Sequence, residues 1–348
     1  MRFAVGYQQP ESGEPFSAVV SDYLGSVSEV YFPWPGMATG RSELGVSRGA
    51  VDWGAQEELL SSLRAIRGMG VRLDILFNAT CHGDEAIGAS LSNRVCSILD
   101  YLGGLGLLPE VATTASPFIA TVVRRHFPEV ELRASVNMRL DSTLAMEYLG
   151  DLFDSFYLRR DLQRDLSQVE AFSVWARRHG KGLCLLANSG CLRFCPYQSF
   201  HDNLVSHNGE LSCRRNVPDF QPHLCWRLYR DRENFEEVLR ASWIRPEDLR
   251  RYEPLVDVVK LATRQHPRPR MVIGAYASGR YGGNLLDLLE PTFAAAFAPY
   301  VLDNASFPSD WAESGVAGAC AANCTHCGRC AEVLARVLRR ADGEDDAP

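Results

Sequence analysis

The stretch Gly182-Leu-Cys-Leu-Leu-Ala-Asn-Ser-Gly-Cys-Leu-Arg-Phe-Cys-Pro196 joins an apolar run directly to a pair of cysteines. Residues 182–188 are almost continuously apolar, as expected for a parallel strand that helices cover. Gly190 lets the backbone turn sharply before Cys191, and Pro196 follows Cys195. The stretch therefore predicts a buried strand whose end carries two thiols.

Seven other β-rich runs alternate along the chain with helical patterns. The runs are Arg2–Tyr7, Val27–Pro33, Leu73–Asn78, Glu110–Thr114, Glu131–Asn137, Ser155–Arg159 and Val256–Ala262. The helical segments are Glu57–Met69, Ala86–Leu102 with Ile87 on its apolar side, Thr143–Leu149, Asp165–Arg178 and Asn234–Arg240. Eight such units predict an α/β fold, a closed (β/α)8 TIM-like barrel. A doubly wound open sheet is the alternative, and no glycine-rich phosphate loop supports nucleotide binding.

Two segments exceed the barrel pattern. Residues 190–254, after the seventh strand, are far too long for an ordinary connection, so we expect an excursion over one face of a barrel that spans 1–270. Residues 271–340 form a cysteine-rich C-terminal extension, with a candidate extra strand at Met271–Tyr276 and a candidate helix at Ala331–Arg340. The acidic tail, 341–348, is expected to be disordered.

Composition and charge limit the class of protein. The net charge of −7 makes general nucleic-acid binding unlikely. No apolar run approaches the length of a membrane span. The N-terminus reads directly as a strand, without a secretory signal, and this predicts a cytoplasmic protein.

Seven of the eleven cysteines fall into two groups, and the first group lies near the predicted barrel mouth. In a reducing compartment, clustered cysteines favour metal over disulfides. Cys191, Cys195 and Cys225, together with Cys81 at the end of the third strand, predict one [4Fe–4S] cluster. The cluster would have four cysteine ligands, or three with one iron open to substrate. Cys184 and Cys213 are nearby in sequence, so the fourth ligand stays open.

The second group is Cys320, Cys324, Cys327 and Cys330, spaced C-x3-C-x2-C-x2-C. Four thiolates within so short a run predict a second [4Fe–4S] cluster in segment 320–330. Structural zinc, with His326 as an additional ligand, is the alternative.

Polar side chains follow most of the predicted strands. In such barrels the active site forms at the carboxyl ends of the strands, so these groups are expected to converge. The candidate catalytic residues, which would move protons or orient substrate, are His82, Asn137, Asn188, His201 and Asp202. The candidate substrate-binding residues are Tyr157, Arg159, Arg160, Lys260 and Arg264, whose cations suit an anionic group. Hydrogen-bonded scaffold and solvated ion pairs are the alternative interpretations.

Four phrases of this sequence resemble peptidase family U thirty-two, the collagenase-like superfamily. The first is Asn188-Ser-Gly-Cys-Leu-Arg-Phe-Cys-Pro196, followed by Phe200-His-Asp-Asn203. The others are Leu76-Phe-Asn-Ala-Thr-Cys81, Thr114-Ala-Ser-Pro-Phe-Ile-Ala120 and Phe153-Asp-Ser-Phe-Tyr-Leu-Arg-Arg160. The resemblance extends over roughly residues 1–265.

The resemblance implies a TIM-like barrel that carries a [4Fe–4S] cluster on four cysteines, with Cys191 and Cys195 among the ligands. Several relatives support oxygen-independent hydroxylation of the ubiquinone ring in anaerobic growth or of RNA bases, in some cases with prephenate as oxygen donor, and some work as heteromers. This sequence departs from the family in two ways. It has no cysteine in the Tyr31–Arg41 loop, and it adds the four C-terminal cysteines, which suggest electron delivery.

The sequence therefore predicts an iron–sulfur-dependent, oxygen-independent redox or oxygen-transfer enzyme that acts on a small anionic or aromatic substrate. An electron-donor protein or a family heteromer partner is the expected protein partner. One alternative is a peptidase or hydrolase with Cys81 and His201 as a thiol–histidine pair, although no G-x-S-x-G or H-E-x-x-H motif supports it. The other is a non-catalytic electron-transfer subunit.

Overall fold

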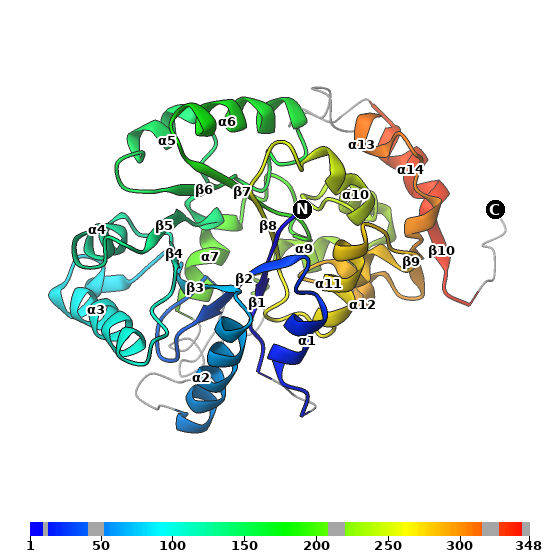
Figure 1. The fold of residues 1–348 in the computed structure, drawn as a ribbon. Coiled ribbons are helices and arrows are strands. Elements are labelled where there is room, and N and C mark those ends of the chain that lie inside the picture. The colour runs from blue at the N-terminus through cyan, green and yellow to red at the C-terminus, as the bar shows by residue number, and fades with distance from the viewer. Residues whose placement is uncertain (10–12, 41–51, 208–219, 315–326, 343–348) are drawn as a thin grey trace.

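Eight parallel strands close into a barrel in chain order (Figure 1). The computed structural model describes residues 1–9, 13–40, 52–207, 220–314 and 327–342. The strands are β1 (Phe3–Gly6), β2 (Val27–Pro33), β3 (Arg72–Phe77), β4 (Val111–Thr114), β5 (Glu131–Ala134), β6 (Ser155–Tyr157), β7 (Gly182–Leu186) and β8 (Val258–Leu261). Pairing of β1 with β8, where Phe3 lies opposite Val259, closes the barrel. The predicted TIM-like barrel is confirmed, and the open sheet is wrong.

The strands match the predicted runs, and most of them end before the predicted last residue, at the mouth of the barrel. β5 stops at Ala134, three residues before its predicted end. Residues 136–138 form a short 3-10 helix, η2 (Val136–Met138). Its start is capped by the Ser135 hydroxyl, which accepts a hydrogen bond from the backbone N–H of Asn137 at 3.2 Å. The turn leaves Asn137 above the strand end, at the mouth of the barrel.

Helices cover the outside of the barrel. Those that follow β1 to β6 are α1 (Phe16–Asp22), α2 (Trp53–Gly68), α3 (Ala89–Gly104), α4 (Pro117–His126), α5 (Thr143–Tyr148) and α6 (Leu166–Arg178). Side-chain caps at Asp52 and Asp165 begin α2 and α6. Ile87, predicted to be on an apolar helix face, is instead 82% exposed, because η1 (Gly83–Glu85) precedes α3 and the helix begins two residues after Ile87.

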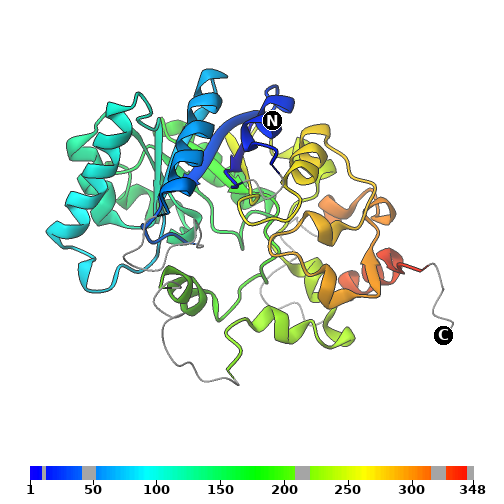
Figure 2. The same cartoon turned by 90° about the horizontal axis from the view of Figure 1, so that it is seen from below.

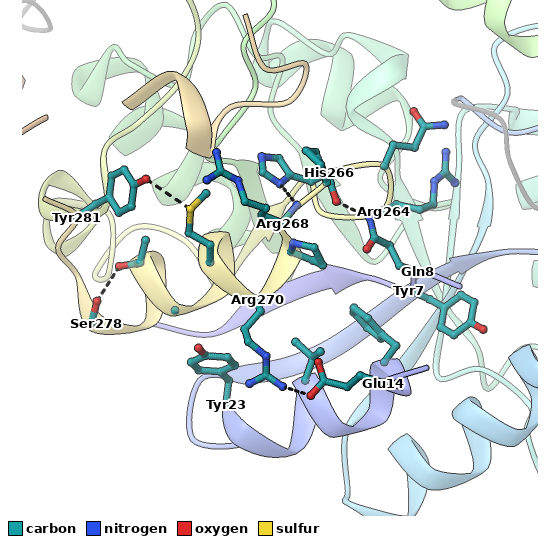
Figure 3. Close-up of a pocket in the computed structure, with 18 of the residues that line it drawn as sticks. Tyr7, Gln8, Glu14, Tyr23, Arg264, His266, Arg268, Arg270, Ser278 and Tyr281 are labelled. Atoms are coloured by element: carbon teal, nitrogen blue, oxygen red, sulfur yellow. Dashed lines mark hydrogen bonds and ion pairs between the residues drawn. The ribbon is translucent and has the colours of Figure 1, made fainter. Parts of the chain in front are cut away.

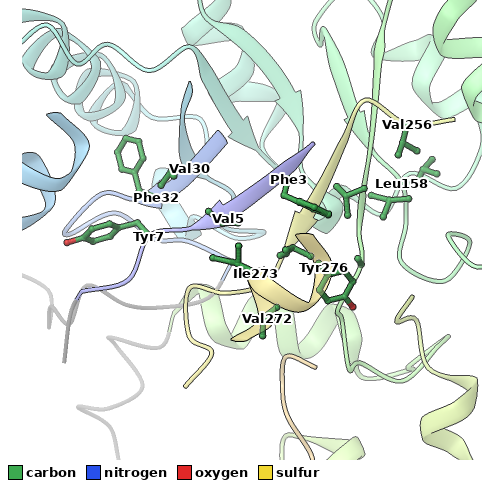
Figure 4. Close-up of a cluster of buried hydrophobic side chains, with 14 of the residues drawn as sticks. Phe3, Val5, Tyr7, Val30, Phe32, Leu158, Val256, Val272, Ile273 and Tyr276 are labelled. Atoms are coloured by element: carbon green, nitrogen blue, oxygen red, sulfur yellow. The ribbon is translucent and has the colours of Figure 1, made fainter. Parts of the chain in front are cut away.

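The predicted extra strand at Met271–Tyr276 is wrong, because these residues lie in α11 (Pro269–Ser278). Pro269 stands in the first turn, where its missing amide hydrogen costs nothing, and Gly279 ends the helix with a positive φ of 66°. Val272, Ile273 and Tyr276 bury one face of the helix against the barrel (Figure 4). The apolar spacing is therefore that of a helix, and α11 covers β8 as the earlier helices cover their strands.

The long segment between β7 and β8 folds over one end of the barrel, as Figure 2 shows along its lower edge. Its elements are α7 (Gln198–Ser206), α9 (Leu224–Leu228), η3 (Arg232–Asn234), α10 (Glu237–Arg240) and η4 (Pro246–Arg251). We call residues 190–254 the excursion. No described helix is long and apolar enough to cross a membrane.

The C-terminal extension packs on the excursion. It comprises η5 (Leu285–Leu288), α12 (Ala294–Phe297), β9 (Tyr300–Leu302), η6 (Asn304–Ser306), α13 (Trp311–Ser314), α14 (Arg329–Val337) and β10 (Leu338–Arg340). Phe235 stacks on Phe297 with ring centroids 3.8 Å apart, and Trp243 stacks on Trp311 at 6.0 Å. These contacts join the two segments in one aromatic core. The helix predicted for Ala331–Arg340 ends at Val337, because residues 338–340 pair with β9.

Charged groups fill the lower part of the barrel interior. Arg133 holds the fully buried Glu29 carboxylate through two hydrogen bonds of 2.5 and 3.1 Å, and its Nε donates to Ser155 at 3.0 Å. Asp74 accepts bonds from the amide and hydroxyl of Thr113 at 3.1 and 2.9 Å. This network closes the barrel beneath the mouth, so the cavity above it has a polar floor.

Candidate functional site

Three of the predicted cluster cysteines lie around one cavity of about 310 Å³ beside the barrel mouth. Cys191 and Cys195 come from the loop after β7, and Cys225 comes from α9. We call this cavity the thiol pocket. The other polar residues that line it are Arg160, Tyr197, Gln198, His201, Asp202, His223 and Gln265.

Two of the three thiols of the pocket have a raised pKa. Burial, reinforced by Cys191 and Cys195, raises the pKa of Cys225 to about 12. Burial also raises the pKa of Cys195. Arg160 donates a hydrogen bond from Nη1 to Cys191 Sγ at 3.3 Å, which places a positive charge beside that sulfur. A bound metal centre ionises its thiol ligands, so it would hold these half-buried thiols as thiolates.

Three of the donors around the thiol pocket are cysteines, the ligands that an iron–sulfur cluster takes. Among the described residues, no three His, Cys, Asp or Glu side chains converge on a point that would hold one ion. In a [4Fe–4S] cluster each thiolate binds a different iron, so the sulfurs surround a cavity instead of converging. Cys191, Cys195 and Cys225 are the residues that would hold such a cluster here.

The loop that carries Cys191 and Cys195 is anchored by Asp161, which is only 1% exposed. Its carboxylate accepts bonds from the Phe194 amide and from Arg159 Nε, each at 2.5 Å. Phe194 has a positive φ of 54°, an unusual conformation for a residue with a side chain. The loop therefore needs Asp161 to hold its shape. Sequence reasoning missed this residue, although it directly follows the two arginines predicted to bind substrate.

Asp161→Ala is expected to lower the free energy of unfolding by about 1–3 kcal/mol, because the Phe194 amide and the half-buried Arg159 guanidinium each lose a hydrogen-bond partner. Urea unfolding measures this change, and the rate of reaction with an aromatic disulfide reports the release of Cys191 and Cys195. Asp141→Ala is the matched control, because Asp141 pairs with the same Arg159 at 3.1 Å but is exposed. Equal effects of the two substitutions would contradict the anchoring role.

A second cavity, of about 80 Å³, lies at the carboxyl ends of the strands. We call it the mouth cavity. It adjoins the thiol pocket, since Arg160, Asp202 and Gln265 line both. Asn137 lines the mouth cavity and donates from Nδ2 to the Asn78 carbonyl at 3.1 Å. The other polar residues that line it are Tyr31, Asn78, Ser189, Lys260, Arg264 and Glu290.

Lys260 lies at the floor of the mouth cavity and is 8% exposed. Its Nζ lies 3.7 Å from the ring centroid of Tyr31 and 5.4 Å from that of Tyr157. Burial lowers the pKa of Lys260 to about 8, and the negative charge of Asp74 opposes this shift. The ring of Tyr31 is fixed in place because its hydroxyl donates to the Leu261 carbonyl at 2.8 Å.

Three other predicted site residues lie outside both cavities. Asn188 is fully buried, and its amide bonds the backbone of Ala262 at 2.6 and 3.2 Å and the carbonyl of Leu288 at 2.9 Å. It joins the ends of β7 and β8 to the extension. Tyr157 lies within the barrel, with Arg133 over its ring at 5.8 Å. Arg159 pairs with Asp141 and Asp161.

Cys81 and His82 follow β3 and lie beside α7 instead of lining either cavity. The amide of the preceding Thr80 donates to Ser206 on α7 at 3.0 Å. Burial lowers the pKa of His82, and its Nε2 has no hydrogen-bond partner among the described residues. Cys81 as a fourth cluster ligand, and Cys81 with His201 as a catalytic pair, both stay predictions.

The C-terminal cysteine group is only partly described. Cys320 and Cys324 lie outside the described residues, as does His326. Cys327 is exposed, and Cys330 is buried at the start of α14. The second metal centre therefore stays a prediction, as does the disorder of the acidic tail, of which residues 343–348 are not described.

A third and larger cavity, about 1500 Å³, is a surface groove between α1 and α11 (Figure 3). Arg270 crosses it and pairs with Glu14 at 2.6 Å. Arg264 and Gln265 line both this groove and the mouth cavity, so the loop after β8 separates the two spaces. The sequence offered no signal for this groove, because its walls come from opposite ends of the chain.

Comparisons with known proteins bear on the family. No protein-family profile matches the chain. Its sequence is 25% identical over 296 residues to an uncharacterized protease of Methanocaldococcus jannaschii, covering 81% of this chain and 82% of that protein. Its fold matches the solved structure of a U32 peptidase with a TM-score of 0.50 and 17% sequence identity, covering 75% of this chain and 91% of that one. The chain is thus similar in sequence to a protein named as a protease and similar in fold to a U32 peptidase, the family that its cysteine motif resembles.

Proposed function

We propose that this chain is an enzyme of the U32 peptidase type, whose active site is formed by the mouth cavity and the thiol pocket. The similarity to the archaeal protease supports the family, and the closed barrel agrees with it. One observation carries the location of the site. Cys191 and Cys195, from the loop after β7, gather with Cys225, from α9, in a cavity that shares Arg160 and Asp202 with the barrel mouth.

Peptide hydrolysis is the chemistry that the names of both relatives support. The residues for it would be among those that line the mouth cavity or the thiol pocket. Asp202 and its neighbour His201 on α7 are placed to hold or move a proton, and Arg160 is placed to bind an anionic group. On this proposal the three thiols either stabilise the excursion through a metal centre or include the nucleophile.

The thiol pocket supports a finer proposal, an iron–sulfur enzyme that works without oxygen on a small anionic or aromatic substrate. A bound [4Fe–4S] cluster would supply electron transfer or an electron-accepting iron. The ligands would be Cys191, Cys195 and Cys225. Arg160, which donates a hydrogen bond to the Cys191 sulfur, would stabilise the negative charge on that ligand. This proposal includes a cytoplasmic location, because free clustered thiols need a reducing compartment.

The same proposal needs a source of electrons. An electron-donor protein or a heteromer partner would provide them, and a second cluster on the C-terminal cysteines would receive them. Zinc at those cysteines, which would make the extension purely structural, is the alternative.

The test is anaerobic purification of the full chain with measurement of iron, acid-labile sulfide and zinc, together with hydrolysis of labelled gelatin. About four irons and four sulfides per chain would support a cluster in the thiol pocket, and about eight of each would support both clusters. About four irons with one zinc would make the C-terminal site structural. Gelatin hydrolysis by folded, iron-free protein would overturn the cluster and leave the thiol hydrolase.

A further inference from the structure

Lys260 is one of only two lysines in the chain. Of the 36 basic residues, Lys181 and Lys260 are lysine, and the other 34 are arginine. Lys181 has an evident structural role, since its ammonium donates to the carbonyls of Phe153 at 2.8 Å and Gly150 at 2.5 Å. The chain therefore uses arginine almost wherever it needs a cation, and Lys260 is an exception that needs its own explanation.

Among the described residues, the amine of Lys260 faces aromatic rings and has no bonded anion. No hydrogen bond or ion pair to its amine occurs among the described residues, and its close neighbours are the rings of Tyr31 and Tyr157. Burying an ammonium without a hydrogen-bonded anion is costly, so burial shifts the equilibrium of Lys260 toward the neutral amine. The charged groups that face it from the barrel and from the loop after β8 are Glu29, Asp74, Arg133 and Arg264, and Arg160, Asp202 and Glu290 share the mouth cavity with it.

An anion clamp would not require lysine. Guanidinium binds carboxylates in a fixed two-pronged geometry and stays charged, whereas an amine can lose its proton and present a lone pair. We propose that Lys260 is a nucleophilic amine that condenses with the carbonyl group of a small substrate in the mouth cavity. The lowered pKa of Lys260, about 8, agrees with this role.

The condensation balances without an oxidant or a reductant. The nitrogen lone pair of Lys260 forms a bond to the carbonyl carbon. The carbonyl oxygen then takes up the two protons released by the nitrogen and leaves as water. The product is an imine, which gains one proton from solvent when it becomes an iminium.

Size and charge narrow the class of ligand. A space of about 80 Å³ admits only a small aldehyde or keto group with its nearest neighbours. Arg160 and Arg264 line the same space, so a carbonyl compound with an adjacent carboxylate fits better than a neutral one. The proposal goes beyond the proposed function, because it needs neither a cluster nor peptide hydrolysis.

The experiment treats the anaerobically purified full chain with glyoxylate and sodium cyanoborohydride, which reduces an iminium to a stable secondary amine. Peptide mapping by mass spectrometry then gives the labelling rate of each lysine, with Lys181 as the internal comparator. At pH 7.5 a pKa of about 8 leaves roughly a hundredfold more neutral amine than an ordinary lysine has. We expect Lys260 to be labelled at least about tenfold faster than Lys181, with a rate that saturates with glyoxylate and rises through about pH 8.

Variants separate the two lysines. Lys181→Arg is expected to keep the fast labelling, and Lys260→Met is expected to abolish it. Labelling of Lys260 that is no faster than that of Lys181, or that stays linear in glyoxylate, would overturn the proposal and leave Lys260 as an anion-binding ammonium. The decisive rates come from the parent chain, so the result stands even if Lys260→Met fails to fold. Iron content plays no part in this readout, so its failure is distinct from failure of the proposed function.

Discussion

Replacing Arg133 by methionine is expected to lower the free energy of unfolding by about 3–5 kcal/mol. Arg133 is 1% exposed, and its guanidinium is the only partner that meets both oxygens of the Glu29 carboxylate among the described residues. Arg72, at the bottom of the barrel, donates a hydrogen bond to one of these oxygens at 2.9 Å, and this bond would remain in the variant. Methionine has a similar length, so the substitution leaves a buried negative charge without leaving a large void.

Two further variants test this interpretation by urea unfolding. Glu29→Gln combined with Arg133→Met removes both charges and should recover much of the loss, because a buried pair replaced as a unit is nearly neutral in free energy. Arg124→Met is the matched control, since Arg124 pairs with the half-exposed Asp154 at 2.7 Å, and it should cost less than about 1 kcal/mol. A loss at Arg133 no larger than at Arg124 would show that the interior pair does not stabilise the barrel.

The barrel was predictable because several of its helix-covered parallel strands are nearly continuous apolar runs. Runs such as Leu183-Cys-Leu-Leu-Ala187 carry that pattern without help from distant residues. The charged barrel interior was not predictable, since a glutamate in β2 and an arginine in β5 look like surface residues until the register brings them together. The strand predicted at Met271–Tyr276 was wrong because a short apolar run does not by itself distinguish strand from helix.

The candidate site was predictable in one respect and not in another. The thiols of Cys191 and Cys195 could be placed at the mouth, because they follow a strand end within a few residues. The partners supplied by the excursion could not be placed, since segment 190–254 has no periodic pattern that fixes how it folds back. For this reason His223, which lies 4.6 Å from His201 between ring centroids, was missed.

Removing the Cys225 thiol is expected to cost the chain one whole cluster. In anaerobically purified Cys225→Ala the iron content should fall by about four per chain relative to the parent, whatever the C-terminal cysteines hold. The physical reason is the position of Cys225. It reaches the thiol pocket from α9, so it is the ligand that would tie α9 to the loop after β7. Iron, acid-labile sulfide and visible absorption measure the loss.

Alanine substitutions at two other cysteines are compared with Cys225→Ala. Cys96→Ala is the matched control, because Cys96 lies in α3 and lines neither the thiol pocket nor the mouth cavity, so iron should not change.

Cys81→Ala tests whether Cys81 is the fourth ligand of the cluster. A loss equal to that of Cys225→Ala would mean that the segment after β3 moves toward the pocket when the cluster binds. Unchanged iron would leave three cysteine ligands from the described pocket, with the fourth iron open to substrate or held by another group. If Cys225→Ala itself keeps all its iron, the thiol pocket is not a cluster site, and its buried thiols belong to the packing of the excursion.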